Sequence, residues 1–109
     1  IVAGTNDADM VLAGNTVRKN KGGLAFALNG QVVGELPLPV AGLMSTENAE
    51  TVEEKLQALK AALKAHGISE DIDAFMTLAF VSLPVIPKLR LNTYGIVDVD
   101  AQQIVPAVF

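Results

Sequence analysis

Residues that could bind a metal ion or transfer a proton are sparse in this chain. Its 109 residues include one histidine, His66, and no cysteine. Aspartates separated by a single residue form three pairs: Asp7 and Asp9, Asp71 and Asp73, and Asp98 and Asp100. Hydrolytic metal centres need clustered histidine and carboxylate ligands, and calcium loops need a turn glycine and a distal glutamate. None of the pairs continues into such a pattern, so we expect no metal ligand and no catalytic residue here.

The other candidates for chemistry have simpler structural explanations. His66 falls in the last turn of a predicted helix, where its charged form would suit the helix C-terminus. Ser45 has no base to activate it, and a hydroxyl in a loop before a helix commonly supports the turn. Glu35 either projects into a shared cleft or is an exposed carboxylate on an edge strand. Gly30 and Gly34 fall in a predicted hairpin rather than in a phosphate-binding loop.

Charge and hydropathy exclude two classes of partner. The formal net charge is −4, and the eight lysines and arginines form no basic stripe, which argues against nucleic acid. The longest charge-free run, residues 74–87, contains two prolines and is shorter than the roughly 18 to 20 apolar residues of a membrane span. The sequence shows no signal or transit peptide, and the lack of cysteine fits a reducing compartment. We therefore expect a cytoplasmic protein that binds neither nucleic acid nor membrane.

Two segments carry the end signals and the periodicity of amphipathic helices. The first runs from about Asp7 to Lys21, with Asn6 or Thr5 as its N-cap. The second runs from about Ala49 to His66 after an N-cap at Asn48. Its apolar residues recur every three or four positions and form one stripe: Val52, Leu56, Leu59 and Leu63.

A β-hairpin is predicted around Asn29-Gly30, because both positions of a tight two-residue turn need a positive φ. The flanking strands are Leu24–Leu28 and Gln31–Leu36. A regular ladder then pairs three sets of residues: Leu28 with Gln31, Phe26 with Val33, and Leu24 with Glu35.

The remaining apolar segments predict further strands. Phe75–Leu83 is continuously apolar and precedes a proline, which favours a buried central strand. Ile1–Ala3 has the character of a strand, and Lys88–Leu91 and Ile96–Val99 flank a turn as a C-terminal hairpin. The resulting fold class is α+β, a split β-α-β-β-α-β arrangement with two helices on one face of a mostly antiparallel sheet. Residues 1–109 are expected to form a single domain.

The chain is more apolar than an ordinary domain. Hydrophobic residues make up 50% of it and there are nine glycines in addition, whereas typical domains reach about 45–50% with glycine included. It also begins inside an apolar, strand-like stretch at Ile1. Both features suggest a piece of a longer chain with part of its surface made for a neighbour, the alternative being a strongly cored small domain with a processed N-terminus.

Four segments of unusual composition identify a family. In chain order they are Val2–Met10, Glu35–Ser45, Phe75–Leu91 and Gly95–Val99. Together they closely resemble the C-terminal domain of bacterial adenine deaminases, members of the amidohydrolase superfamily, over nearly the whole chain. The two longest segments are too idiosyncratic to match by chance.

The resemblance implies an intact enzyme that hydrolyses adenine to hypoxanthine and ammonia in purine salvage. In that family a (β/α)₈ barrel holds the metal ions, manganese or iron, and metal-bound water attacks C6 of the purine. None of the barrel's ligands can be carried over to a position of this chain. The resemblance therefore implies a non-catalytic domain, inactive by itself, whose partners are the barrel of the same chain and, through the intact enzyme, adenine.

Two proline-bounded loops are the candidates for contact with the barrel or for the rim of its cleft. The candidate residues are Gly42, Leu43, Met44, Ser45, Pro84, Val85, Ile86, Pro87 and Arg90. Large apolar side chains in these loops are costly to leave in water, and Arg90 could meet a carboxylate of another domain. The alternative is that the loops close the core of this domain.

Two other functional hypotheses remain at this point. The chain could be a stand-alone binding or oligomerisation module of the same ancestry, and a homo-oligomer is possible in either case. A fragment that is catalytically active by itself is the weaker option, since the ligand types of a hydrolytic centre are missing.

Overall fold

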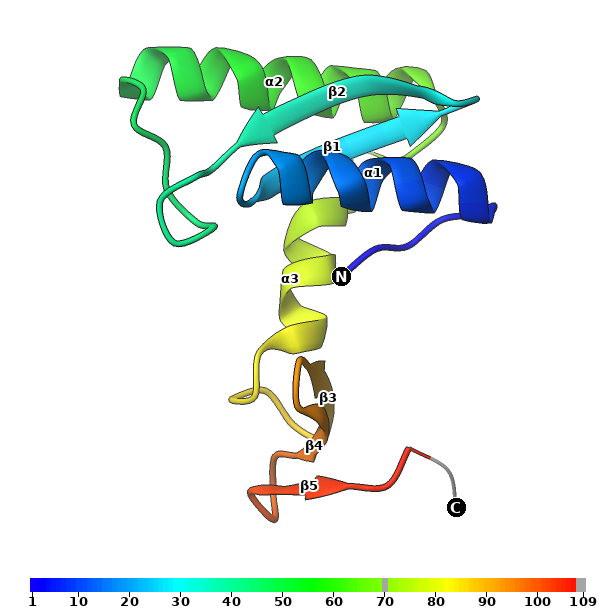
Figure 1. Cartoon of the computed structure of the whole chain (residues 1–109), viewed down its shortest axis with the longest axis vertical. Helices are drawn as coiled ribbons and strands as arrows, with labels where there is room; N and C mark the ends of the chain where they lie inside the picture. The colour runs from blue at the N-terminus through cyan, green and yellow to red at the C-terminus, as the bar shows by residue number, and fades with distance from the viewer. Residues whose placement is uncertain (70, 108–109) are drawn as a thin grey trace. The chain divides into compact units, whose positions relative to one another are not determined.

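The computed structural model describes residues 1–69 and 71–107 (Figure 1). Within them the elements are α1 (Asp7–Lys19), β1 (Gly23–Leu28), β2 (Gln31–Pro37), α2 (Ala49–Ala65), α3 (Ala74–Ser82), β3 (Leu89–Asn92), β4 (Gly95–Asp98) and β5 (Gln103–Val105). They divide into two compact units. We call Val2–Ile72 the N-terminal unit, and Ile1 with the residues from Asp73 onward the C-terminal unit.

Helix α1 forms where its capping signals predicted it. The side chain of Asn6 accepts a hydrogen bond from the backbone N–H of Asp9 at 2.9 Å, which satisfies one of the free donors of the first turn. Acidic residues lie in the first turn and basic residues in the last, as the helix dipole favours. The helix ends at Lys19, two residues before the predicted end, and Gly22 with a φ of 132° lets the chain turn into β1.

Strands β1 and β2 form the predicted antiparallel hairpin, with positive φ angles at both Asn29 and Gly30. The pairing of Leu28 with Gln31 is confirmed. The pairings of Phe26 with Val33 and of Leu24 with Glu35 are wrong, since Phe26 pairs with Gly34 and Leu24 pairs with Leu36.

The correction arises from a β-bulge, in which one strand has an extra residue. The register shifts between Phe26 and Ala27, so that Val33 is unpaired and every later residue of β2 moves by one position. A one-residue shift exchanges the two faces of a strand. It turns Leu36 into the core and leaves Glu35 exposed.

Helix α2 packs against the hairpin and supplies the core of the N-terminal unit. Its N-cap is Asn48, as predicted, whose side chain accepts from the N–H of Thr51 at 2.9 Å. Leu59 and Leu63 of the predicted stripe are buried together with Leu36. Gly34 makes the close packing possible, since a Cβ atom added there would lie 2.7 Å from Cδ1 of Leu59.

The segment predicted as a buried central strand is instead helix α3. An uninterrupted apolar run has no alternation that separates a strand from a helix. The deciding feature is Asp73, whose carboxylate accepts from the N–H of Met76 at 3.0 Å and caps the first turn. Ala74, Met76, Leu78 and Ala79 are good helix formers, and Pro84 comes directly after the C-cap residue Leu83.

The C-terminal hairpin is confirmed, with β3 and β4 pairing as Leu89↔Asp98 to Asn92↔Gly95. Strand β5 adds to β4 and completes an antiparallel sheet in the order β3-β4-β5. Ile1–Ala3 forms no strand.

The α+β class is therefore confirmed, whereas the split β-α-β-β-α-β order is replaced by a two-stranded and a three-stranded sheet among the described residues. The change follows from the two segments that did not become strands, since a single sheet would have needed both. The grouping of residues 1–109 into one domain stays a prediction.

Candidate functional site

The first candidate loop, Gly42–Ser45, is a tight turn in the N-terminal unit. Val40 and Met44 exchange both backbone hydrogen bonds at 3.0 Å, and the φ of Gly42 is 76°. Leu43, at the tip, is 77% exposed, and Met44 is also exposed. Backbone bonds thus fix the loop, while its two large apolar side chains project into solvent.

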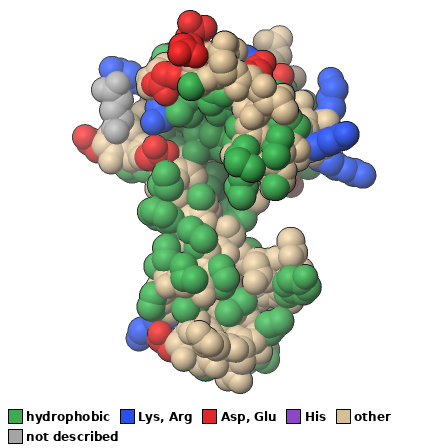
Figure 2. All heavy atoms as spheres, turned by 90° about the vertical axis from the view of Figure 1, so that its left-hand side faces the viewer, with side chains coloured by type: hydrophobic (Ala, Val, Ile, Leu, Met, Phe, Trp, Pro, Cys, Tyr) green, Lys and Arg blue, Asp and Glu red, His purple; other side chains and the backbone are tan. Residues whose placement is uncertain are grey.

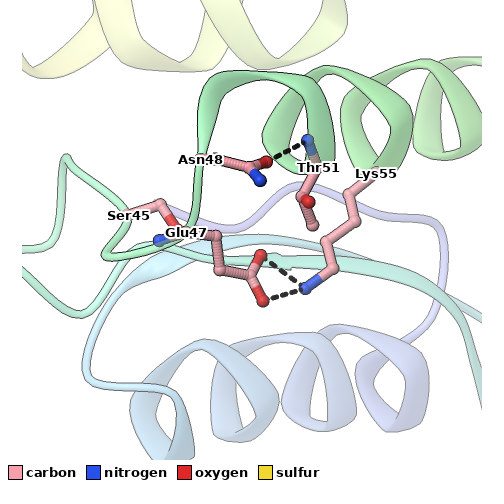
Figure 3. A network of polar contacts seen from close by, with 5 residues as sticks. All are labelled: Ser45, Glu47, Asn48, Thr51 and Lys55. Atoms are coloured by element: carbon pink, nitrogen blue, oxygen red, sulfur yellow. Dashed lines mark hydrogen bonds and ion pairs between the residues drawn. The ribbon is translucent and has the colours of Figure 1, made fainter.

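Ser45 belongs to a polar network at the start of α2 (Figure 3). Its Oγ accepts from the backbone N–H of Glu47 at 3.0 Å, next to the cap formed by Asn48 and Thr51. Lys55 reaches back to the Glu47 carboxylate at 2.6 Å. This ion pair is well exposed, so it contributes at most about 1 kcal/mol. The hydroxyl of Ser45 supports the turn, as its position in the sequence indicated.

The second candidate loop, Pro84–Pro87, lies in the C-terminal unit together with Arg90. Val85 is 75% exposed, and Ile86 is half-buried with its N–H donating to the carbonyl of Leu83 at 3.3 Å. The two candidate loops thus belong to different units.

Arg90 turns back onto its own segment. Its two terminal nitrogens donate to the carbonyls of Leu89 at 2.6 Å and Pro87 at 2.7 Å. The third nitrogen, Nε, is buried and has no hydrogen-bond partner among the described residues. The guanidinium therefore braces the loop before β3.

One aspartate of each pair accepts a hydrogen bond from a backbone N–H group. Asp73 caps α3, and Asp98 accepts from the N–H of Ala101 at 2.9 Å. Asp9 accepts from the Asn6 side chain and from the backbone N–H groups of the hairpin turn. The Asn6 bond, followed by the backbone bond from Gly30, holds the pKa of the Asp9 carboxyl below its ordinary value. Across residues 1–69 and 71–107 no three His, Cys, Asp or Glu side chains form a possible metal site.

The main surface feature is a large number of exposed apolar side chains (Figure 2). In the C-terminal unit, no described residue is buried. Helix α3 has no charged residue, and Met76 and Phe80, four positions apart on one stripe, are both about half exposed. Helices that are apolar all round are normally buried. Among the described residues, no helix has the length and hydropathy to span a membrane.

Comparison with known proteins identifies the family of the chain. A family model described as "Adenine deaminase C-terminal domain" matches residues 1–103. The chain belongs to this family.

Similar proteins are much longer than the chain. The chain is 47% identical over 106 residues to "Adenine deaminase 2" of Carboxydothermus hydrogenoformans, and this match covers 97% of the chain and 19% of that protein. It is 55% identical over 98 residues to the adenine deaminase of Kosmotoga olearia, covering 90% of the chain and 17% of the relative. The corresponding match in Bacillus velezensis has 42% identity and covers 97% and 18%. The chain thus spans less than a fifth of these relatives.

Sequence reasoning missed α3 as an exposed apolar element, because a central strand was expected to be covered on both faces. The available signal was the sequence Asp73-Ala74-Phe75-Met76, a capping aspartate followed by residues that tolerate the first turn of a helix. It also missed the exposure of Leu89 and Leu91 on β3.

Proposed function

We propose that this member of the adenine deaminase C-terminal domain family is a non-catalytic part of a metal-dependent adenine deaminase. The intact enzyme would hydrolyse adenine to hypoxanthine and ammonia in cytoplasmic purine salvage. One observation carries the proposal: the family match extends over residues 1–103, yet the chain accounts for less than a fifth of its relatives. The larger remainder is where a catalytic barrel would lie.

The residues of this chain do not fit the manganese or iron that the proposal assigns to the enzyme. Metal ligands of hydrolases come as clustered imidazoles and carboxylates. The single histidine, His66, follows α2, and its ring lies 5.8 Å from the ring of Phe26. Asp9, Asp73 and Asp98 accept backbone hydrogen bonds. In this proposal the metal is held by another part of the full-length protein.

An assay on two proteins tests this division of labour. We expect the purified 109-residue chain to release no ammonia from adenine in the presence of added manganese, and the full-length protein that contains it to release ammonia and form hypoxanthine together. Incubation with hypoxanthine, which has no amino group to lose, measures the background. Turnover by the 109-residue chain alone would contradict the non-catalytic role.

The candidate loops would contribute contacts with the rest of the enzyme. Leu43 and Val85 are each about three-quarters exposed, and burial of a large apolar side chain is worth roughly 1.5–3 kcal/mol. Among the described residues neither side chain finds a cover that recovers this free energy, which supports a role for both loops as an interdomain surface or as the rim of the cleft.

Truncating the side chains of Leu43 and Val85 tests whether the two loops contact the rest of the enzyme. In the full-length protein, Leu43→Ala and Val85→Ala should lower either the adenine turnover or the melting temperature. Val11→Ala is the control, because Val11 is also an exposed apolar residue but lies on α1, outside both loops. Wild-type turnover with an unchanged melting temperature would remove the loops from the interface.

A stand-alone oligomerisation module is the alternative function, since the same exposed apolar surface could bury itself against a second copy. The reading frame of the gene distinguishes the two. Several hundred codons continuing upstream of Ile1 support the enzyme, and a start codon beside Ile1 supports the module.

A further inference from the structure

Strand β3 exposes its apolar side chains and partly covers its polar ones. Leu89 is 47% exposed and Leu91 is 49% exposed, whereas Arg90 and Asn92 are half-buried. A sheet with one covered face normally turns its apolar residues toward the cover and its polar residues toward water. The arrangement on β3 is the reverse, so its two leucines lack a full cover among the described residues.

The register extends this face across all three strands of the sheet. Leu91 pairs with Ile96, and Ile96 pairs with Val105, which gives a row of three apolar residues. Directly opposed residues of neighbouring strands are close enough to act as one contact surface. We call Leu89, Leu91, Ile96 and Val105 the leucine face.

The leucine face borders an open hollow of about 420 Å³. The hollow is lined by Lys88, Leu89, Asp98, Asp100, Ala101 and Val105. Leu89 and Val105 belong to the face itself, and Asp98 is the cross-strand partner of Leu89. A large apolar side chain could enter between the aliphatic residues, with two carboxylates and one ammonium group beside it.

We propose that the leucine face is the docking surface for an apolar segment from the remaining part of the adenine deaminase chain. One large side chain of that segment fills the hollow, and a lysine or arginine of the same segment pairs with Asp98 or Asp100. The inference rests on the proposed function, since the segment belongs to the more than four-fifths of the relatives that this chain does not cover.

Two arguments favour a segment of the same full-length polypeptide over other occupants of the leucine face. No described residue of the C-terminal unit is buried, and a segment linked to the chain would meet the leucine face at a high effective concentration. In a symmetric dimer the face would meet itself, which would bring two copies of the Asp98 and Asp100 pair into one interface against only two copies of Lys88. A basic segment instead complements this excess of negative charge.

Cysteine labelling tests the proposal, because the chain contains no cysteine of its own. L91C probes the leucine face, and I104C is the matched control. Ile104 is 60% exposed and lies in the same sheet, but alternation places it on the opposite face from Val105. The reactivity of each new thiol toward a maleimide is measured by mass spectrometry of its peptide, in the 109-residue chain and in the full-length protein.

We expect both thiols to react at similar rates in the 109-residue chain. In the full-length protein the reaction of L91C should slow by about tenfold or more, because a covered thiol reacts only during local opening, while I104C stays fast. L89C serves as a second probe if L91C does not fold in the full-length protein. Equal labelling of the leucine-face probe in both proteins overturns the docking surface.

Two further outcomes are informative. Concentration-dependent protection of L91C in the 109-residue chain would identify a second copy as the occupant and overturn the intramolecular proposal. The ammonia assay on the same full-length samples is read separately. An active deaminase with unprotected L91C refutes the docking face alone, and a protected but inactive full-length protein refutes the proposed function alone.

Discussion

The carboxylate of Asp9 connects two elements that are distant in sequence. It lies in the first turn of α1 and accepts hydrogen bonds from the backbone N–H groups of Asn29 at 3.0 Å and Gly30 at 2.7 Å. The Asn6 side chain donates a third bond at 2.9 Å. Asp9 therefore joins the N-cap of the helix to the turn of the hairpin, and its ionised form is the one that these donors stabilise.

This arrangement predicts a pH dependence of stability. The pKa of Asp9 in the folded chain lies below its ordinary value of 3.8. The stabilisation of the folded chain by ionised Asp9 is therefore complete above pH 3.8 and is lost as the pH falls through the lowered pKa. Asp9→Asn should destabilise the chain at pH 7 and lose this part of the acid dependence, as measured by urea unfolding at pH 7 and at acid pH. An identical dependence in both proteins would contradict the role of Asp9.

Two glycines in the N-terminal unit should respond in opposite directions to the same change. Gly34→Ala puts a Cβ atom 2.7 Å from Leu59 Cδ1, and overpacking of this kind costs about 1–3 kcal/mol. Gly14→Ala in α1 meets Val2 at an ordinary 3.5 Å, and alanine in a helix is more stable than glycine by roughly 0.5–1 kcal/mol. Denaturant unfolding measures both free energies. Equal changes in the free energy of unfolding for the two variants would show that α2 moves easily to accommodate the methyl group added at Gly34.

At the scale of the elements, local signals in the sequence predict more than the pairing of distant segments. The caps at Asn6 and Asn48 and the Asn29-Gly30 turn depend on neighbouring residues, and all three are confirmed. The bulge at Val33 is accompanied by the close approach of Gly34 to Leu59 of α2, a contact that no short window of sequence contains. Helix α3 was missed because an apolar run fits either a covered strand or a covered helix.

The same limit applies to the candidate site. The loops around Leu43 and Val85 were singled out by their composition as candidates for an interdomain contact, and that role stays a prediction. The leucine face was not singled out, because alternation along β3 tells which residues share a face but not which face is covered.

The N-cap of α3 offers a test at this scale. Asp73→Ala removes the acceptor for the N–H of Met76, and loss of such a cap costs roughly 0.5–2 kcal/mol. The amides of the first turn of α3 should then exchange faster with solvent deuterium. Asp73→Asn is the control, because asparagine is an equally good N-cap and should preserve the protection. Equal exchange in the alanine and asparagine variants would contradict the assigned role of the cap.

At the scale of the whole molecule, the two units differ in how much of their stability lies within the chain. Every buried apolar residue that the structure describes, Leu36, Leu59 and Leu63, belongs to the N-terminal unit. The C-terminal unit has paired strands and a capped helix, but its large apolar side chains remain in contact with water. We infer that the first unit holds its fold by itself, and that the second is completed by whatever covers it.

A single core substitution tests this division. Leu59→Ala opens a cavity at the most buried side chain, and such changes cost about 2–5 kcal/mol. Hydrogen exchange followed by mass spectrometry should show loss of protection throughout α1, β1, β2 and α2, while the strands of the C-terminal unit exchange as in the wild type. The two units would then be separate cooperative units, each opening with its own free energy. Loss of protection in β3, β4 and β5 to the same extent would show that the core around Leu59 also holds the C-terminal unit, and the case for an external cover would weaken accordingly.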